Sequence, residues 1–476
     1  MMKRPDMIRY QCKKNTLFLF FMAVFSFLWQ TSYAGLMDEY LLSSHAKYQT
    51  QLNRYPENSL YRELIDATTF DQLIDTRWML SARKNKFDVN VDYQLQVVDG
   101  DMLGFSQSSN ELLNTNSFFS TNAFVSDDLR VFDLTHVVSN DEDTVLLHRL
   151  DRMNVGYSNN NMTVRVGRQV VSWGNGLIYN PLDFFNPFDP AAIDKEYKTG
   201  DDMLYAQYLL ESGSDVQAVW VARREPKDSI LASTLNNKSR GDISSSQQSM
   251  AIKYHYVNYD SSSSGSNNFL AGLELDFVLA QHYEDEIVGV GLVKSIGGAL
   301  WRSDVMVTKT ERQRATSFVT NLSYSWVWRG HNVSGIIEYF YNGFGVKKNS
   351  ISLADLTPVS EDDVIFDLLS KVQRGELYGI GRHYFAASAS IELTPLMIAS
   401  PTLFINLVDS SALFQLTASY DIAQNWQIIG ALNVPIGSKD TEFGGMSSDL
   451  GVLNNNFTDT TLATDTSLFV QFAFYF

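Results

Sequence analysis

The sequence has little cysteine, little proline and no long apolar run beyond its first 29 residues. Cys12 is the only cysteine, which excludes a small secreted module held together by disulfides. No apolar run after Trp29 approaches the roughly 20 residues that a membrane helix needs. Basic residues are outnumbered, with 37 Lys and Arg against 54 Asp and Glu, and no basic stripe points to nucleic acid as a partner.

The first 34 residues have the order of a secretory signal peptide. A basic leader precedes an apolar run over residues 16–29, which is too short to span a bilayer comfortably. Small residues then follow at Ser32 and Ala34, where a signal peptidase cleaves. Residues 1–34 are therefore predicted to be removed on export and are left out of the fold.

The C-terminal segment alternates between apolar and mixed positions. In a strand, every second side chain points to the same face, so this segment has one wholly apolar face. A closed barrel in lipid has no free edge and offers hydrocarbon to that face. The pattern resembles the C-terminal targeting strand of bacterial outer-membrane barrels, which implies an outer-membrane location and recognition by the barrel assembly machinery. The residues that carry this assembly signal are Leu468, Val470, Phe472, Phe474 and Phe476.

Residues 86–476 have the alternation of many β-strands. Phe318, Leu322 and Tyr324 oppose Asn321 and Ser323, for example. The segments between the strands are alternately short and long when counted back from the C-terminus, as in barrels with short periplasmic turns and long external loops. The sequence therefore predicts an all-β, transmembrane antiparallel β-barrel of about 16 strands, or 18 if residues 118–138 add a hairpin.

Residues 35–85 have a different pattern. Leu41, Leu42, His45 and Tyr48 recur at roughly helical spacing, and further on Thr69 with Gln72 matches a helix capping box. These features predict a short N-terminal helical segment. It acts as a plug in the barrel mouth, lies in the periplasm and engages a partner there, lies along the membrane, or is only a spacer.

Residues 171–199 are predicted to form a loop that folds into the barrel and narrows it. Proline and glycine are too frequent here for a regular strand, and irregular backbone at membrane depth must be buried in protein or line water. A compact external cap is the alternative. The Gly-Arg-Gln motif at 167–169, Trp-Gly at 173–174 and Asn-Pro-x-Asp at 180–183 resemble a family of uncharacterised large outer-membrane barrels related to alginate-export and substrate-specific porins. The candidate constriction residues are Arg168, Trp173, Asp183, Phe184, Phe185, Asp189, Asp194 and Lys195.

Charged residues of both signs alternate with the apolar positions of the predicted strands, so they are expected to face a water-filled lumen. Acidic residues are in excess, which favours a neutral, cationic or amphipathic solute over a polyanion. The candidate lumen charges are Arg165, Glu274, Asp276, Arg302, Asp304, Glu338, Arg382 and Glu392.

No motif predicts catalysis, a bound metal or another cofactor. We therefore expect a non-enzymatic outer-membrane channel that passes or exports small solutes. Outer-membrane lipid and lipopolysaccharide are its expected surroundings. The alternative is an accessory barrel for assembly or export, with a periplasmic partner bound through residues 35–85. The weakest hypothesis is an outer-membrane hydrolase.

Overall fold

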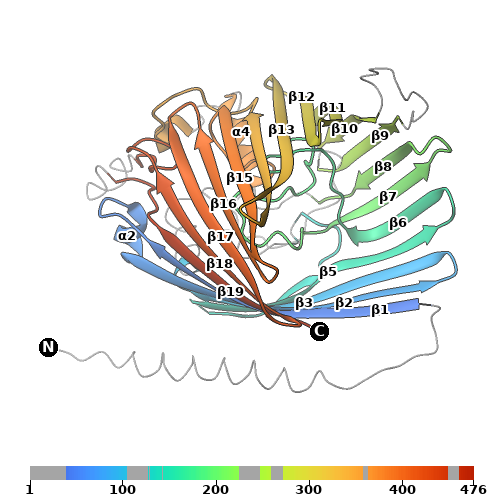
Figure 1. The fold of residues 1–476 in the computed structure, drawn as a ribbon, viewed down its shortest axis with the longest axis horizontal. Helices are drawn as coiled ribbons and strands as arrows, with labels where there is room; N and C mark the ends of the chain where they lie inside the picture. The colour runs from blue at the N-terminus through green and yellow to red at the C-terminus, as the bar shows by residue number, and fades with distance from the viewer. Residues whose placement is uncertain are drawn as a thin grey trace.

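The chain forms one closed antiparallel β-barrel (Figure 1). The computed structural model describes residues 39–103, 127, 129–141, 143–224, 247–258, 272–356, 363–448 and 460–476. The predicted signal peptide lies outside these residues. In the described part of the chain, no helix is long and apolar enough to cross a membrane.

Eighteen strands make the wall, and a nineteenth, β4, lies beside β5. The described segments also contain the short helices α2 (Leu60–Leu64) and α4 (Ile365–Gln373) and a 3-10 turn at Leu353–Leu356. The strands are β1 (Glu39–Arg54), β2 (Thr68–Lys84), β3 (Phe87–Gly100), β4 (Thr135–Asn140), β5 (Thr144–Ser158), β6 (Met162–Gln169), β7 (Asp201–Leu209), β8 (Asp215–Val221), β9 (Ser249–Val257), β10 (Leu273–His282), β11 (Asp285–Ile296), β12 (Ala299–Lys309), β13 (Arg314–Trp328), β14 (His331–Tyr341), β15 (His383–Thr394), β16 (Met397–Asn406), β17 (Ser411–Ala423), β18 (Trp426–Ile436) and β19 (Ser467–Tyr475).

The first and last wall strands close the barrel. β1 pairs with β19 from His45 opposite Tyr475 to Asn53 opposite Ser467. The alternation predicted for the C-terminal segment is present, because Leu468 and Phe472 are 47% and 42% exposed whereas Phe469 and Ala473 are buried. The apolar face of β19 therefore lies on the outside of the barrel.

The prediction of a helical segment over residues 35–85 is wrong. Residues 39–54 and 68–84 are wall strands that pair with each other along their whole length, and only α2 between them is helical. The apolar residues of this stretch fit both a helical and a two-residue period over a short window. β1 pairs with β19 and β2 pairs with β3, so both segments are strands. No separate plug or periplasmic domain remains in the described residues.

The strand number agrees with the alternative prediction of 18, but by a different route. The two additional wall strands are β1 and β2. The predicted hairpin at 118–138 lies mostly outside the described residues, and the strand at 135–140 is not a separate member of the wall. β6 pairs with β5 only from Ser158 to Met153, and β4 then pairs with the same edge of β5 from Arg149 to Val145. β4 thus covers backbone groups that β6 leaves unpaired.

One end of the barrel has short connections, as predicted. The links at 85–86, 297–298, 329–330, 395–396 and 424–425 have two residues each, and only the link at 258–272 is long at this end. The predicted long links, which include 171–200 and 343–377, lie at the opposite end, where the structure has them at 170–200 and 342–382. Three short links at 283–284, 310–313 and 407–410 lie at the same end. We call these the turn end and the loop end, and the turn end corresponds to the periplasmic side.

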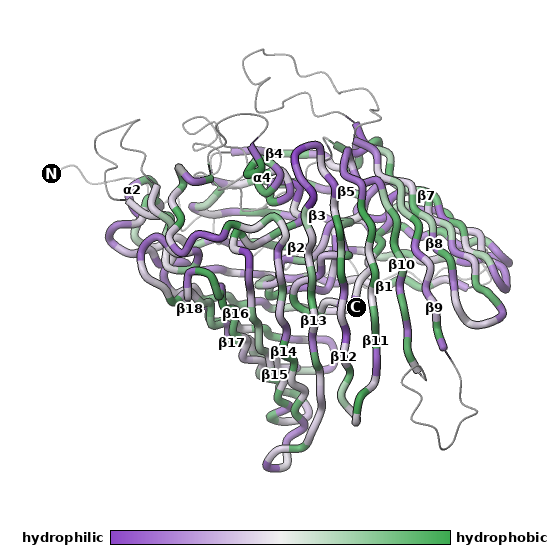
Figure 2. The backbone as a smooth tube through the Cα atoms, turned by 90° about the horizontal axis from the view of Figure 1, so that it is seen from above, coloured by the Kyte–Doolittle hydropathy of each residue, from purple (hydrophilic) through white to green (hydrophobic). Residues whose placement is uncertain are grey.

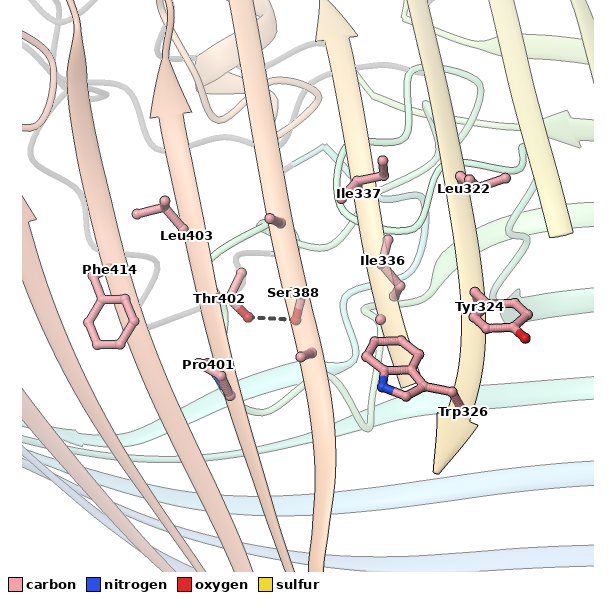
Figure 3. A pocket seen from close by; sticks show the side chains of 13 residues that line it. Leu322, Tyr324, Trp326, Ile336, Ile337, Ser388, Pro401, Thr402, Leu403 and Phe414 are labelled. Carbon is pink, nitrogen blue, oxygen red and sulfur yellow. Dashed lines mark hydrogen bonds between the residues drawn. The ribbon is translucent and has the colours of Figure 1, made fainter. Parts of the chain in front are cut away.

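The outer surface is apolar along the strands. On β10, Phe277 and Leu279 are 44% and 57% exposed, while Asp276 and Val278 between them are buried. In Figure 2, hydrophobic stretches run along strands such as β11 and β16. A groove of about 430 Å³ on the outside of β13–β17 is walled by large apolar side chains, and the Trp326 ring lies over Gly335 (Figure 3). Hydrocarbon is the solvent that suits such a surface.

Candidate functional site: a loop across the lumen

The chain leaves the wall at the end of β6 and crosses the barrel interior as residues 170–200 before it returns at β7. Figure 1 shows this segment inside the ring of strands. It has no regular secondary structure, and its polar backbone groups are bound by side chains of the wall. We call it the lumen loop.

The first contact of the lumen loop is with β8 and β12. The indole Nε1 of Trp173 donates a hydrogen bond of 2.8 Å to Oε1 of Gln217. The backbone N–H and the side-chain amide of Asn175 both donate to the Asp304 carboxylate, at 2.6 and 2.7 Å. Asn321 on β13 then donates to the Asn175 carbonyl at 3.1 Å. These bonds fix both the backbone and the side chain of Asn175 against the wall.

Glu338 on β14 anchors three consecutive residues of the lumen loop. Its carboxylate accepts hydrogen bonds from three consecutive backbone N–H groups, those of Leu177, Ile178 and Tyr179, at 2.8, 3.2 and 2.6 Å. Glu338 is only 1% exposed, so this carboxylate holds the loop and does not face open water.

An apolar wedge supports the middle of the lumen loop. Trp173, Leu182, Phe184 and Phe185 pack in one buried cluster with wall residues of β7–β12, among them Met203, Val219, Val278, Ile287 and Met306. Gly289 and Gly291 on β11 leave the room for this approach. A Cβ at Gly289 would lie 2.4 Å from Leu182 Cδ2, and one at Gly291 would lie 2.5 Å from Asn175 Nδ2. Two glycines at alternate positions of one strand are a sequence signal for the close approach of a second segment, and this signal was not used in the prediction above.

The second half of the loop is held on the opposite side of the barrel. Lys47 on β1 makes ion pairs of 2.6 Å with both Asp194 and Glu196. The Tyr475 hydroxyl on β19 donates to Glu196 at 3.0 Å, so Glu196 contacts the first and the last wall strand. Gln415 on β17 donates to the Ala191 carbonyl at 2.8 Å. The loop is therefore attached around most of the circumference, as an inward-folded segment requires.

Lys198 near the end of the lumen loop binds both the middle and the beginning of the loop. Lys198 Nζ lies 2.6 Å from Asp183 Oδ1 and also donates to the Val171 carbonyl. Burial raises the pKa of Asp183 to about 6, although the Lys198 ammonium opposes this rise. Burial also lowers the pKa of Lys198. Both shifts have the same physical cause, because removal from water disfavours each charge.

The structure distributes the predicted constriction residues over three environments. Trp173, Phe184 and Phe185 form the wedge, and Asp183 and Asp194 are bound in ion pairs. Asp189 and Lys195 are exposed on the loop, where Lys195 Nζ donates to the Pro190 carbonyl. Among the missed residues, Leu177 is 41% exposed on the loop. These exposed positions are the ones that water inside the barrel can reach.

Arg168 does not line the constriction, and its assignment to that group was wrong. Its guanidinium is buried between Asp127 and Asp202, with ion pairs of 2.9 Å to each, and it also donates to the Phe132 carbonyl. Asp202 lies at the start of β7, and Asp127 and Phe132 lie in the segment before β4. Arg168 thus ties the wall together beside the point at which the lumen loop departs, which the sequence motif alone did not reveal.

Several predicted lumen charges face inward, but they are already bound to other groups of the protein. Asp276, Asp304 and Glu338 bind the lumen loop through Asn175 or through backbone N–H groups. Arg302 donates to Ser323, and Arg165 lies 3.7 Å from Asp88. Glu274 is half-buried on β10. Arg382 donates to the Gly345 carbonyl and the Tyr341 hydroxyl, whereas Glu392 near the turn end accepts from Asn332.

An arginine cluster on β2 and β5, which the sequence analysis missed, surrounds one buried carboxylate. Asp151 lies 2.7 Å from Arg77, 3.5 Å from Arg149 and 2.6 Å from Arg152. Asp151 is the extra residue of a β-bulge against β3, and bulges re-aim side chains in this way. Arg77 also lies over the Tyr197 ring of the lumen loop at 4.3 Å. The cluster therefore supports the loop from the wall.

A Ser–His–Glu chain bears on the hydrolase hypothesis. Ser249 Oγ lies 2.9 Å from His282 Nδ1, and His282 Nε2 lies 3.1 Å from Glu376. Ser249 is fully buried and also accepts a hydrogen bond from Arg223 at 2.7 Å. A nucleophile must reach its substrate, and this hydroxyl is enclosed. Within the described residues, no group of three or more His, Cys, Asp or Glu side chains is placed to hold a metal ion.

The closed wall, its apolar outer surface and its polar interior define a transmembrane β-barrel protein. Barrels of this architecture belong to the outer membrane, and this is where the chain resides.

Comparisons with known proteins add no finer assignment. A family model described as a protein of unknown function (DUF1302) matches residues 152–229, which include β6 and the lumen loop. No curated protein matches the sequence.

Solved structures with a similar chain path include OccAB1 from Acinetobacter baumannii, with 10% identity and a TM-score of 0.47 over 94% of this chain and 99% of that one. A BenF-like porin from Pseudomonas fluorescens Pf-5 has 7% identity and a TM-score of 0.46 over 93% of this chain and 100% of that one. Wzi from Escherichia coli, an outer membrane protein involved in group 1 capsule assembly, has 10% identity and a TM-score of 0.45 over 90% of this chain and 83% of that one. Similarity at this level carries no argument about function.

Proposed function

We propose that this protein is an outer-membrane channel for small solutes, with the lumen loop as the constriction that selects them. The observation that carries the proposal is the attachment of the loop at Asn175, at Glu338 and at Lys47, on different sides of the barrel. A segment held in this way narrows a wide barrel to a defined opening. Selection then depends on the width of that opening and on the side chains around it.

The cargo that fits this channel is a small neutral, cationic or amphipathic solute. The lumen carboxylates of Asp276, Asp304 and Glu338 are bound to the loop, and the arginines of the cluster are bound to Asp151. A polyanion needs free inward-facing cations along its path, and these arginines do not supply them. No enzymatic step is part of this proposal.

Substituted-cysteine labelling in planar bilayers tests the position of the loop. The chain has one native cysteine, Cys12, in the predicted signal peptide, so an introduced thiol in the processed protein is unique. We expect a bulky thiol reagent to reduce the single-channel conductance of Leu177→Cys and Lys195→Cys. Val166→Cys, which is 56% exposed at a position opposite the inward face of β6, is the matched control and is expected to be unaffected.

The outcomes of this experiment separate the hypotheses. Wild-type protein without stepwise current would reject the channel. Currents that persist unchanged after labelling of both loop positions would place the constriction elsewhere. The accessory-barrel hypothesis assigned partner binding to residues 35–85. Residues 39–54 and 68–84 are strands of the wall, so a periplasmic partner would have to use another surface. Engagement of the assembly machinery by Leu468, Val470, Phe472, Phe474 and Phe476, and contact with lipopolysaccharide, remain predictions.

A further inference from the structure

The inner wall of β13–β17 carries a group of hydroxyl side chains below the lumen loop. We call it the hydroxyl surface, and it consists of Ser325, Ser334, Ser388, Ser390, Thr402 and Thr417. Strand register places these residues together. Ser325 is opposite Ser334, Ser334 is opposite Ser390, and Ser388 is opposite Thr402. Cross-strand neighbours on one face lie about 5 Å apart, so the hydroxyls form a continuous patch over five strands.

Alternation along the strands shows that this patch faces the lumen. On β14, Glu338 binds the lumen loop, and Ser334 lies four positions away on the same face. On β17, Gln415 binds the loop, and Thr417 is the next residue on that face. None of the six side chains is buried. They therefore contact the space below the loop.

The patch has no charged member. On β14 and β15 the nearest inward-facing charges are Glu338 above it, which the lumen loop occupies, and Glu392 toward the turn end, which accepts from Asn332 at 2.7 Å. Arg302 on β12 lies at its side and donates to Ser323 at 3.0 Å. A charged solute would find no counter-ion on this surface.

The hydroxyls keep hydrogen-bonding capacity. The Oγ atoms of Ser325 and Ser334 lie 2.8 Å apart, and so do Ser388 Oγ and Thr402 Oγ1; Figure 3 shows the second pair. Each hydroxyl has one donor and two acceptor positions, so a pair that shares one bond retains one donor and three acceptors. At the upper border, Asn321 is 2% exposed and its Oδ1 has no hydrogen-bond partner among the described residues.

We propose that the hydroxyl surface is a weak binding track for uncharged polyhydroxylated solutes, such as sugars and polyols. A polyol exchanges its bonds to water for bonds to serine and threonine one at a time, since both partners donate and accept. An ion loses hydration here without gaining a counter-ion. Binding that is weak and distributed over several sites also lets a solute leave, as conduction requires. This inference rests on the proposed channel and names the class of its cargo.

Proteoliposome flux of three probes of similar size and different charge tests the proposal: glucose, gluconate and glucosamine. The variant is Ser388→Ala with Thr402→Val. The matched control is Ser158→Ala with Thr163→Val, because these hydroxyls form the same kind of cross-strand pair, 3.2 Å apart, on the inner face of β5 and β6. We expect glucose flux through the first variant to fall by about threefold to tenfold, the effect of one or two lost hydrogen bonds. Flux of gluconate and glucosamine should stay unchanged, as should all fluxes through the control.

An equal fall for all three probes would indicate altered pore shape and overturn the proposal, as would an equal effect in the control. Ion conductance is measured in parallel, so its absence in the wild type identifies failure of the channel itself. In that event, saturation-transfer NMR of glucose with the detergent-solubilised barrel decides the remaining question. A signal lost in Ser388→Ala/Thr402→Val and kept in the control supports the binding track, and no wild-type signal overturns it.

Discussion

The two sides of the barrel interior are built on different principles. Around β2 and β5, buried arginines and carboxylates pair with each other and support the lumen loop, as in the cluster of Arg77, Arg149 and Arg152 around Asp151. On β13–β17 the hydroxyl surface has no charge at all. The charged side of the lumen thus stabilises the wall and the lumen loop, while the uncharged side is the proposed binding surface for the solute.

Burial explains why the charged side cannot also serve as a binding surface. A charge taken out of water is costly unless it is paired and hydrogen-bonded, and these arginines have found their partners within the wall. A solute would have to break such pairs to bind there. Hydroxyls cost less to expose or to rebind, so they tolerate the repeated exchange of partners that passage demands.

The largest expected effect comes from removing the centre of the arginine cluster. Asp151→Ala leaves three cations without their carboxylate, and breaking a buried pair in this way costs about 3–5 kcal/mol. Urea unfolding of the refolded barrel in detergent measures the loss. Ser390→Ala, at an exposed position of the hydroxyl surface, is the comparison and should change the unfolding free energy by less than about 0.5 kcal/mol. Equal effects would contradict the division into two sides.

Release of the lumen loop at Glu338 should produce the largest change in conductance. Glu338→Ala removes the acceptor of three backbone N–H groups, so the loop should detach locally and single-channel conductance should rise severalfold. Glu338→Gln keeps one carbonyl acceptor and should give an intermediate value. Conductance at or below the wild-type value in both variants would show that the loop does not restrict the pore.

Glu442 offers a pH-dependent test at the loop end above β15 and β16. Among the described residues its hydrogen-bond donors are all neutral, namely Tyr384, Asn406 and the N–H of Ile380. Burial raises the pKa of Glu442 from 4.5 to about 7, against these hydrogen bonds. The folded state therefore holds the proton more tightly than the unfolded state. The resulting stabilisation is complete below pH 4.5 and disappears as pH rises through about 7.

Urea unfolding between pH 4.5 and 8 measures this effect, which amounts to about 1–3 kcal/mol at most. Glu442→Gln stays neutral at every pH and should remove that part of the slope. An unchanged slope in the variant would assign the pH dependence to other groups.

The smallest effect is expected for the hydroxyl surface itself. Ser388→Ala with Thr402→Val removes one hydrogen-bonded pair at a partly exposed site, so the unfolding free energy should change by about 1 kcal/mol or less. Comparing the unfolding free energy of this variant with that of Ser158→Ala/Thr163→Val shows whether a difference in flux between them comes only from a difference in stability. A loss above about 3 kcal/mol would mean that the pair is structural.

The residue pattern predicted the barrel because alternation is local. β19 and β13 have the predicted inside and outside faces, and the inward loop with its Trp173, Phe184 and Phe185 wedge was predicted from its proline and glycine content. β1 and β2 were missed because their apolar spacing over a short window fits a helix as well as a strand. Only their pairing with β19 and β3 distinguishes the two.

The candidate site was predicted only in part, because local alternation shows which way a side chain points but not what it binds. The sequence predicted that Asp276, Asp304 and Glu338 face inward, but it did not reveal that the lumen loop binds all three. Arg168 was assigned to the constriction from its motif, although its partners Asp127 and Asp202 place it in the wall. Partners more than thirty residues away in the chain leave no local pattern.

By itself, the sequence determined the class of protein, since a two-residue period of apolar side chains needs lipid on one side and water on the other. Tertiary structure alone decided which charges are free and which are bound, because an ion pair depends on side chains that meet only after the barrel has closed. For the same reason, the neighbourhood of Ser388 and Thr402 on separate strands became visible only in the register of the wall.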